Sequence, residues 1–239
     1  MTSNTQNKIY YNKKIKKCNI EIAKHVNRLF NKNDHISLLD LGCGNAGLIF
    51  MLTKKFKNLK STGVDVDEKL IKFCKKNAKE LKIDHRITFI NKNFSNFETQ
   101  KKFDLIVCSG FLCFYQDFRT PLKKILKLTR NKESKIILFG DFNSHAVNKV
   151  VKYQDVSKYN NNQKWLEGFT SFSIKTIKEY VVKKNYKLVS YKFNLNQNIG
   201  NKNDDPIRSI SRILNNFGRI IFNKANLIFD FHTLIISKK

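Results

Sequence analysis

A glycine-rich segment with acidic residues on either side is the part of this sequence whose residue types and spacing best suit chemistry. Gly42, Gly44 and Gly47 stand in G-x-G-x-x-G spacing within LLDLGCGNAG. Glycines in such a turn let the backbone approach a ligand closely, because a Cβ atom there would collide with it. Asp40 stands two positions before Gly42. A negatively charged side chain in this place would not help to bind a pyrophosphate, which is itself an anion. We therefore expect Asp40 to face a cationic group such as an ammonium or a sulfonium.

A second carboxylate, Asp65, follows Gly44 by 21 residues, at the end of the next expected strand. A carboxylate in that place can accept hydrogen bonds from both hydroxyls of a ribose. Plainer interpretations exist, since Gly42 and Gly44 could form a tight turn without a cofactor and Asp65 could be a surface carboxylate or a helix cap. Their joint occurrence in an ordered series of strands and helices favours a bound nucleoside.

The elements that must position these residues alternate between strand and helix. Apolar runs predict a strand that ends at Asp40 and four more over residues 61–66, 86–91, 103–109 and 135–140. Amphipathic spacing predicts helices over residues 15–30, 48–56, 68–81 and 121–128. Parallel strands need crossover helices, so this order predicts a parallel sheet covered on both faces, with a ligand crevice at the carboxyl ends of the strands.

Four segments are expected along the chain. They are a helical segment over 1–34, the α/β core over 35–141, an insertion or lid over 142–172, and the C-terminal part of the sheet with a cap hairpin over 173–239. The last segment should contain a helix over 173–184 with Ser173 as its N-cap, a strand over 186–195, a hairpin around Asn216 and Gly218, and a final strand over 227–239.

The composition excludes several classes of protein. Hydrophobic residues make up 41% of the 239 residues and Phe contributes 20, which is too rich in core-forming side chains for a disordered chain. The longest nearly uncharged apolar stretch, 105–114, is about half of the ~20 residues that span a bilayer, and the N-terminus lacks the apolar core of a secretory signal. Five cysteines without C-x-x-C spacing indicate free thiols in the cytoplasm. We expect no metal, because no cysteines or histidines have ligand-like spacing.

The formal net charge of +27 points first to nucleic acid, because phosphate neutralisation needs basic residues. Only seven of the 46 basic residues are Arg, however, whereas base readout and bidentate phosphate recognition favour Arg. Lys, Asn, Ile and Phe are abundant together, and all have A- and T-rich codons, so a biased genome would produce the same charge. We therefore favour a solvated, Lys-rich surface over a nucleic-acid or anionic-surface role.

Asp40, Gly42, Gly44 and Asp65, the last within GVDVDEKLI, resemble the motifs of the class I S-adenosylmethionine-dependent methyltransferase family. The resemblance covers residues 35–141. It implies a Rossmann-like, doubly wound, mostly parallel seven-stranded sheet with an antiparallel last strand, here FHTLIISKK, plus a small lid or cap insertion. A nicotinamide-binding Rossmann protein is the sharper alternative, and Asp40 disfavours it.

The resemblance also implies a cofactor, S-adenosyl-L-methionine, and the residues that bind it. In the family the glycine turn lies against the methionine part of the cofactor, and an acidic residue at the end of the second strand binds the ribose. Asn93 stands where the family usually has an Asp near the adenine, and Ser109 would lie near the methionine end. The expected cofactor-binding residues are Asp40, Gly42, Cys43, Gly44, Asp65, Val66, Asn93, Phe94 and Ser109.

The methyl acceptor must be inferred from less specific residues. His145, just beyond the fifth expected strand, is the candidate general base, and a solvent-facing loop histidine is the plainer alternative. Asp141, Asn143, Trp165 and Glu167 form a polar and aromatic set that could line the acceptor pocket. Asp141 could instead cap the next element, and Trp165 could pack the insertion onto the sheet.

Three functions follow from these observations. The first is transfer of a methyl group to an O or N of a small molecule or saccharide by in-line displacement, favoured because the insertion and cap could enclose a pocket. The alternative is an RNA or protein methyltransferase that uses the basic surface. A third interpretation, a degenerate domain that binds no cofactor, is disfavoured by the intact Asp40, Gly42, Gly44 and Asp65.

Overall fold

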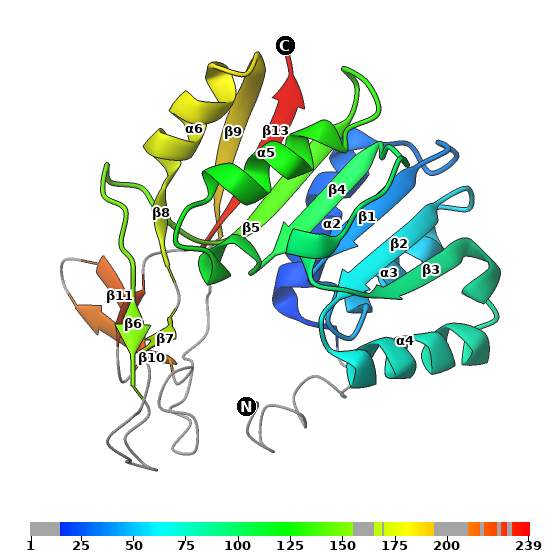
Figure 1. Cartoon of the computed structure of the whole chain (residues 1–239), viewed down its shortest axis with the longest axis horizontal. Helices are drawn as coiled ribbons and strands as arrows, with labels where there is room; N and C mark the ends of the chain where they lie inside the picture. Colours follow the sequence, from blue (N-terminus) through cyan, green and yellow to red (C-terminus); the bar gives the residue numbers. More distant parts are fainter. Residues whose placement is uncertain are drawn as a thin grey trace.

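The computed structural model describes residues 15–154, 165–168, 170–193, 210–215, 218–223, 226–228 and 231–239. Its centre is a sheet of seven strands in the order β3-β2-β1-β4-β5-β13-β9, with the short β8 paired to β5 (Figure 1). The strands are β1 (Ser37–Leu41), β2 (Lys60–Asp65), β3 (Ile87–Asn91), β4 (Leu105–Ser109), β5 (Lys135–Asn143), β9 (Tyr186–Phe193) and β13 (Phe231–Lys238). β1 to β5 pair in parallel, and β13 is antiparallel to both of its neighbours. The doubly wound, mostly parallel sheet with an antiparallel last strand is therefore confirmed.

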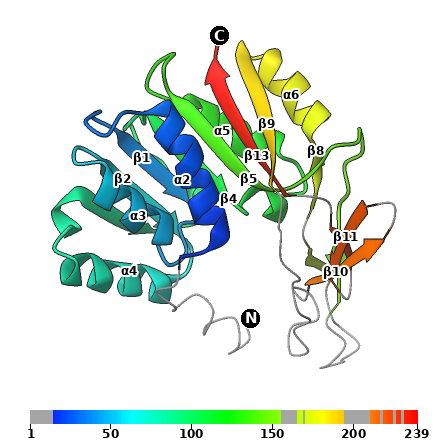
Figure 2. The same cartoon turned by 180° about the vertical axis from the view of Figure 1, so that it is seen from behind.

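Helices cover both faces of this sheet. They are α2 (Lys17–Leu29), α3 (Gly47–Lys55), α4 (Glu68–Glu80), α5 (Arg119–Lys127) and α6 (Ile174–Val182). One hydrophobic cluster joins α2, α3 and α4 to the sheet, and a second joins α5 and α6 to the opposite face. Figure 1 shows α5 and α6 in front of the sheet, and Figure 2 shows α2 and α3 from behind. This layering explains why all five residues of β1 are buried, because a central parallel strand has no solvent-facing side.

The order of the strands in the sheet also determines where a ligand can bind. The strand order reverses between β1 and β4, which are hydrogen-bonded neighbours although β2 and β3 come between them in the sequence. Loops that leave such a switch point run to opposite faces of the sheet and leave a crevice at the carboxyl ends of the strands. The residues after β1, β2 and β4 are therefore those best placed to bind a ligand.

Smaller strands lie outside this core. β6 (Lys152–Tyr153) pairs with β7 (Leu166–Glu167), and β8 (Phe172–Ser173) runs parallel to the end of β5. β10 (Ile210–Asn215) and β11 (Gly218–Asn223) form the expected hairpin, which β12 (Asn226–Ile228) extends. None of the described helices is long and apolar enough to cross a membrane.

Three expectations for the C-terminal half need correction. The final strand does not run over 227–239, because β12 pairs with β11 and only β13 joins the main sheet. β5 continues to Asn143 rather than ending at residue 140, because its end pairs with β8. Ser173 does occupy the N-cap of α6, but it makes no side-chain capping hydrogen bond, since it is also the last residue of β8.

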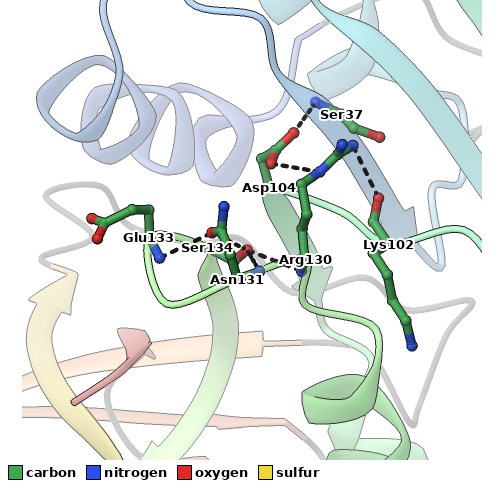
Figure 3. A network of polar contacts seen from close by, with 7 residues as sticks. All are labelled: Ser37, Lys102, Asp104, Arg130, Asn131, Glu133 and Ser134. Carbon is green, nitrogen blue, oxygen red and sulfur yellow. Dashed lines mark hydrogen bonds and ion pairs between the residues drawn. The ribbon is translucent and has the colours of Figure 1, made fainter.

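A polar network links the amino ends of β1, β4 and β5 (Figure 3). These ends lie at the opposite edge of the sheet from the carboxyl ends that border the crevice. The Asp104 carboxylate, just before β4, accepts a hydrogen bond from the backbone N–H of Ser37 at 2.8 Å. It also pairs with Arg130 Nε at 2.9 Å, and the Arg130 guanidinium donates to the carbonyl of Lys102. The Ser134 hydroxyl then accepts from the backbone of Arg130. Asp104 therefore accepts from a backbone N–H of β1 and from the Arg130 guanidinium at the same time.

Candidate active site

A cavity of about 860 Å³ lies at the carboxyl ends of the parallel strands. Its walls come from the ends of β1, β2, β4 and β5, the loops that follow β1, β3 and β4, the start of α2, and β13. This volume is near the upper end of the ~300–1,000 Å³ range of pockets that hold one ligand. All nine residues expected to bind the cofactor line it.

The glycine turn after β1 has the backbone that its sequence predicts. Gly42 and Gly44 both adopt positive φ, at 73° and 54°, a region that residues with a Cβ atom enter only at a cost. The amide groups of Gly42 and Cys43 both donate to the carbonyl of Val64 in the neighbouring strand. A Cβ atom on Gly47 would lie 2.9 Å from the Asn19 amide nitrogen of α2. The first two glycines therefore shape the turn, and the third admits α2.

Asp65, at the end of β2, is bound to this turn. Its Oδ2 atom accepts a hydrogen bond from the backbone N–H of Gly44 at 2.8 Å, and its Oδ1 atom accepts from the N–H of Asp67 at 3.0 Å. Each carboxylate oxygen can accept more than one hydrogen bond, so Asp65 can hold the turn and still accept from a ligand. Asp67 itself caps α4, since its side chain accepts from the N–H groups of Lys69 and Leu70.

Asp40 is the most unusual acidic group of the cavity. It lines the cavity although only 3% of its surface is exposed. Burial, together with repulsion from Asp65, raises the pKa of Asp40 to about 7. Across the described ranges, no hydrogen bond to its carboxylate is found. A buried carboxylate in this state is costly unless a cation or a donor is supplied, so Asp40 fits a positively charged ligand group.

The remaining cofactor candidates lie along the same cavity. Asn93 caps the short turn Phe94–Asn96 by accepting from the N–H of Ser95, which leaves its amide group as a donor. The Phe94 ring meets Phe111 edge to face with centroids 5.3 Å apart. Ser109, at the end of β4, lies close enough to Cys18, near the start of α2, to influence the pKa of its thiol. These contacts join the walls from β3, β4 and α2 around one cavity.

Two buried cysteines, Cys43 and Cys74, belong to the glycine turn or contact it. The Cys74 thiol of α4 lies 3.3 Å from the carbonyl oxygen of Gly44, to which it donates. Burial and the nearby Asp65 raise the pKa of Cys74 to about 12, and burial raises the pKa of Cys43 as well. Both thiols therefore stay protonated near neutral pH and serve packing rather than nucleophilic attack.

The acceptor candidates are only partly brought together. Asp141 lines the cavity, and its Oδ1 atom accepts a hydrogen bond from the Ser171 hydroxyl at 3.3 Å. Asn143 is 1% exposed and lies outside the lining, because its amide binds the carbonyl of Val147 and the N–H of His145. It therefore shapes the loop after β5.

The other three candidates lie away from the cavity lining or outside the described side chains. The His145 ring is exposed and is not among the residues that line the cavity. Trp165 is 63% exposed and is not among them either. Glu167 lies in β7, and its side chain falls outside the described part of the structure. The proposed roles of these residues stay predictions.

Sequence reasoning missed the aromatic side chains that line the cavity. Phe111, Phe114 and Tyr115 come from the loop after β4, and Phe139 and Phe231 come from the paired strands β5 and β13. The dense aromatic run FLCFY directly after β4 was the available signal. Phe231 offered no such signal, because only the antiparallel pairing of β13 with β5 brings it to the site.

The site differs from a metal centre in its donor set. Among the residues that the structure describes, no group of three or more His, Cys, Asp or Glu side chains is arranged to hold a metal ion. The features that remain are a buried carboxylate, a glycine turn with positive φ and a second carboxylate at the next strand. These fit S-adenosylmethionine, because Asp40 suits its cationic methionine part and Asp65 suits its ribose.

Comparisons with known proteins agree with this geometry. The model of the family described as "Methyltransferase domain" matches residues 32–185. Malonyl-[acyl-carrier protein] O-methyltransferase of Priestia megaterium is 28% identical over 110 residues, which are 46% of this chain and 38% of that protein. (S)-Tetrahydroprotoberberine N-methyltransferase of Eschscholzia californica is 27% identical over 112 residues, 47% of this chain and 31% of that protein.

A solved structure extends the likeness of fold over nearly the whole chain. An S-adenosylmethionine-dependent methyltransferase from Clostridium acetobutylicum superposes with a TM-score of 0.58 at 15% identity, covering 94% of this chain and 92% of that one. The curated relatives are matched over a smaller share, since the chain spans only 38% and 31% of the two named above. The family model, which matches more than half of the chain, carries the assignment. This chain belongs to the class I S-adenosylmethionine-dependent methyltransferase family.

Proposed function

We propose that this chain transfers a methyl group from S-adenosylmethionine to an oxygen or nitrogen atom of a small molecule. The observation that carries the proposal is the buried Asp40 carboxylate, which lines the cavity two residues before a turn with positive φ at Gly42 and Gly44. A carboxylate with its pKa raised to about 7 gains most from a cationic partner.

The residues of the chain would bind and orient the two reactants. S-adenosylmethionine, when bound, supplies an electrophilic methyl group on a sulfonium. Asp40 and the backbone of the glycine turn would hold its methionine part, and Asp65 its ribose. Asn93 and Phe94 would contact the adenine. The main task of the protein is then to hold the acceptor atom in line and exclude water, which can supply much of the rate enhancement.

The nature of the acceptor is also part of the proposal. By its name, the first relative described above acts on malonyl-[acyl-carrier protein] and the second on (S)-tetrahydroprotoberberine. The cavity of about 860 Å³ is near the upper end of single-ligand pockets, which supports a small acceptor beside the cofactor. The basic surface does not by itself favour RNA as the acceptor, because a genome rich in A and T codons would produce the same Lys-rich composition. The five cysteines are all free thiols, which supports a reducing compartment, the cytoplasm.

Product formation tests the proposal. The protein would be incubated with S-adenosylmethionine and pooled small-molecule acceptors, and S-adenosylhomocysteine would be followed by mass spectrometry. Gly42→Val is the matched inactive control, because its branched side chain is strained at a φ of 73°. Acceptor-dependent product from the wild type and none from Gly42→Val is expected. Equal product from both proteins would contradict the proposed site.

A further inference from the structure

Aromatic side chains line the part of the cavity that is not formed by the residues expected to bind the cofactor. Five rings belong to this aromatic wall, Phe111, Phe114, Tyr115, Phe139 and Phe231. Phe111 and Tyr115 lie with centroids 5.3 Å apart, and Phe139 and Phe231 stack at 5.8 Å with only 14° between their planes. Four of the five rings thus form two pairs, one from the loop after β4 and one from the sheet.

Backbone contacts connect the two pairs. The N–H of Gly110, one residue before Phe111, donates to the carbonyl of Phe139 at 2.7 Å. The loop that bears the first pair therefore starts directly beside the strand that bears the second. Phe114 is 56% exposed at this wall, so its ring is accessible to a ligand in the cavity.

One carboxylate belongs to the same region as these rings. Asp141 stands opposite Phe231 in the register of β5 and β13, and two residues after Phe139 on the same side of β5. The single proton of the Ser171 hydroxyl is shared between the Oδ1 atom of Asp141, at 3.3 Å, and the carbonyl oxygen of Asp141, at 3.1 Å. A carboxylate held in this way is an acceptor for a hydrogen bond from a ligand N–H or O–H group.

Lysine side chains on and beside the cavity, among them Lys149, Lys16 and Lys92, limit the net negative charge around Asp141. Lys149 interacts electrostatically with Asp141, although it is not among the residues that line the cavity. Lys16, just before α2, does line the cavity. Lys92 follows β3, four strands from β5, or about 19 Å at ~4.8 Å per strand. The wall is therefore not strongly negative, and neutral as well as cationic donors can approach Asp141.

We propose that the acceptor is a flat aromatic compound whose nucleophilic N–H or O–H group donates to Asp141 while its ring lies against the aromatic wall. This inference rests on the methyltransferase function proposed above and narrows its substrate class. Ring-to-ring contacts give such a ligand orientation as well as affinity. A saccharide would instead need several side-chain donors and acceptors around its rim, and beside its rings this wall supplies few polar groups, the Tyr115 hydroxyl and the Asp141 carboxylate.

Calorimetry with matched probes tests the inference. The protein is first titrated with S-adenosylhomocysteine, and the saturated protein is then titrated with 2-naphthylmethylamine, 2-naphthol, 2-methoxynaphthalene and methyl α-glucopyranoside. The amine and the naphthol carry the two kinds of donor on one ring, the methoxy compound lacks a donor, and the glucoside represents saccharides. The variants are Phe114→Ala and Asp141→Asn, with Asp117→Asn as a control because Asp117 is an exposed carboxylate outside the cavity lining.

The inference predicts that a donor-bearing naphthalene binds more tightly than both the methoxy compound and the glucoside. Phe114→Ala should weaken it about 3- to 10-fold, and Asp141→Asn about tenfold, with a larger effect on the amine than on the naphthol. Asp117→Asn should match the wild type. All three variants should bind S-adenosylhomocysteine normally, which shows that they are folded.

Each contrary result has a separate meaning. Three results would overturn the inference while leaving the methyltransferase function in place. They are tighter binding of the glucoside than of the naphthalenes, no binding of either donor-bearing naphthalene, or binding to Phe114→Ala and Asp141→Asn that is as tight as to the wild type. Failure of the wild type to bind S-adenosylhomocysteine would instead overturn the proposed function on which the inference rests.

Discussion

The Asp65 carboxylate accepts a hydrogen bond from the backbone N–H of Gly44 at 2.8 Å, across 21 positions of sequence. The residue at the end of β2 is thereby attached to the turn at the end of β1. Because the other carboxylate oxygen accepts from Asp67, one side chain orders both the glycine turn and the start of α4. A change at Asp65 should therefore affect the shape of the site as well as its polarity.

Removal of Asp65 should cost cofactor affinity. We expect Asp65→Ala to weaken S-adenosylhomocysteine binding by about 100-fold, because it removes both a ligand acceptor and the acceptor for Gly44. Asp67→Asn is the matched control, since Asn caps a helix about as well as Asp and Asp67 does not line the cavity. Calorimetry on the three proteins checks this. An affinity loss in Asp67→Asn as large as that in Asp65→Ala would show that α4, not Asp65, determines binding.

Asp40 should make cofactor binding depend on pH. Its pKa rises from 3.8 to about 7 in the folded protein, and a cationic ligand prefers the charged form, so binding below pH 7 must release a proton. Affinity for S-adenosylhomocysteine should rise about fivefold from pH 6 to pH 7, reach about tenfold by pH 8 and then level off. Asp40→Asn should bind weakly with a flat profile. A wild-type profile that is flat between pH 5.5 and 8 would contradict this role.

The same group affects stability with a definite sign. Between about pH 4 and pH 7 the folded protein holds a proton on Asp40 that the unfolded chain has lost. The contribution of Asp40 to the free energy of unfolding is therefore greatest below pH 4, falls as pH rises to 7 and is constant above. Urea unfolding of the wild type and Asp40→Asn at pH 5 and pH 8 measures it. From pH 5 to pH 8 the free energy of unfolding of the wild type should fall relative to that of Asp40→Asn.

Asp104 should matter for stability but not for binding. Asp104→Ala leaves the N–H of Ser37 without its acceptor and Arg130 without its carboxylate, so we expect a loss of about 1–3 kcal/mol in unfolding free energy. Glu133→Ala is the control within the same network, where only the backbone of Glu133 is bonded, and should change stability by less than about 0.5 kcal/mol. S-adenosylhomocysteine affinity should be unchanged, and a clear loss would show coupling between the two edges of the sheet.

His145 can be tested directly as a general base. Its ring is exposed and lies outside the cavity lining, so we expect His145→Ala to retain methyl-transfer activity close to the wild type once an acceptor is found. General bases commonly contribute about 100-fold or more. A loss of that size in kcat, with S-adenosylhomocysteine affinity unchanged, would establish His145 as the base and require the loop after β5 to move.

Local sequence predicted the core of the fold because each element there follows a simple pattern. β1 is a fully buried, leucine-rich strand that leads directly into the glycine turn, and α4 follows the capping Asp67. The C-terminal part was harder. Residues 226–228 and 231–238 read as one apolar run, and only the pairing of β12 with β11 separates them. At Ser173 the pairing of β8 with β5 displaced the capping hydrogen bond that the sequence suggested.

The cofactor side of the site was easier to predict than the acceptor side for a related reason. Asp40, Gly42, Gly44 and Asp65 follow directly from strand ends, which parallel pairing brings to one edge. Acceptor residues come instead from loops and from a distant antiparallel strand, so spacing along the chain says little about them. Phe231 reaches the site only through its register with Asp141, which no local pattern contains.

A titration of the wild-type protein with S-adenosylmethionine, with NAD as the competing dinucleotide, tests the central claim most directly. The account predicts saturable binding of S-adenosylmethionine in the micromolar range and no heat from NAD. Absence of S-adenosylmethionine binding, or binding of NAD in its place, would contradict it.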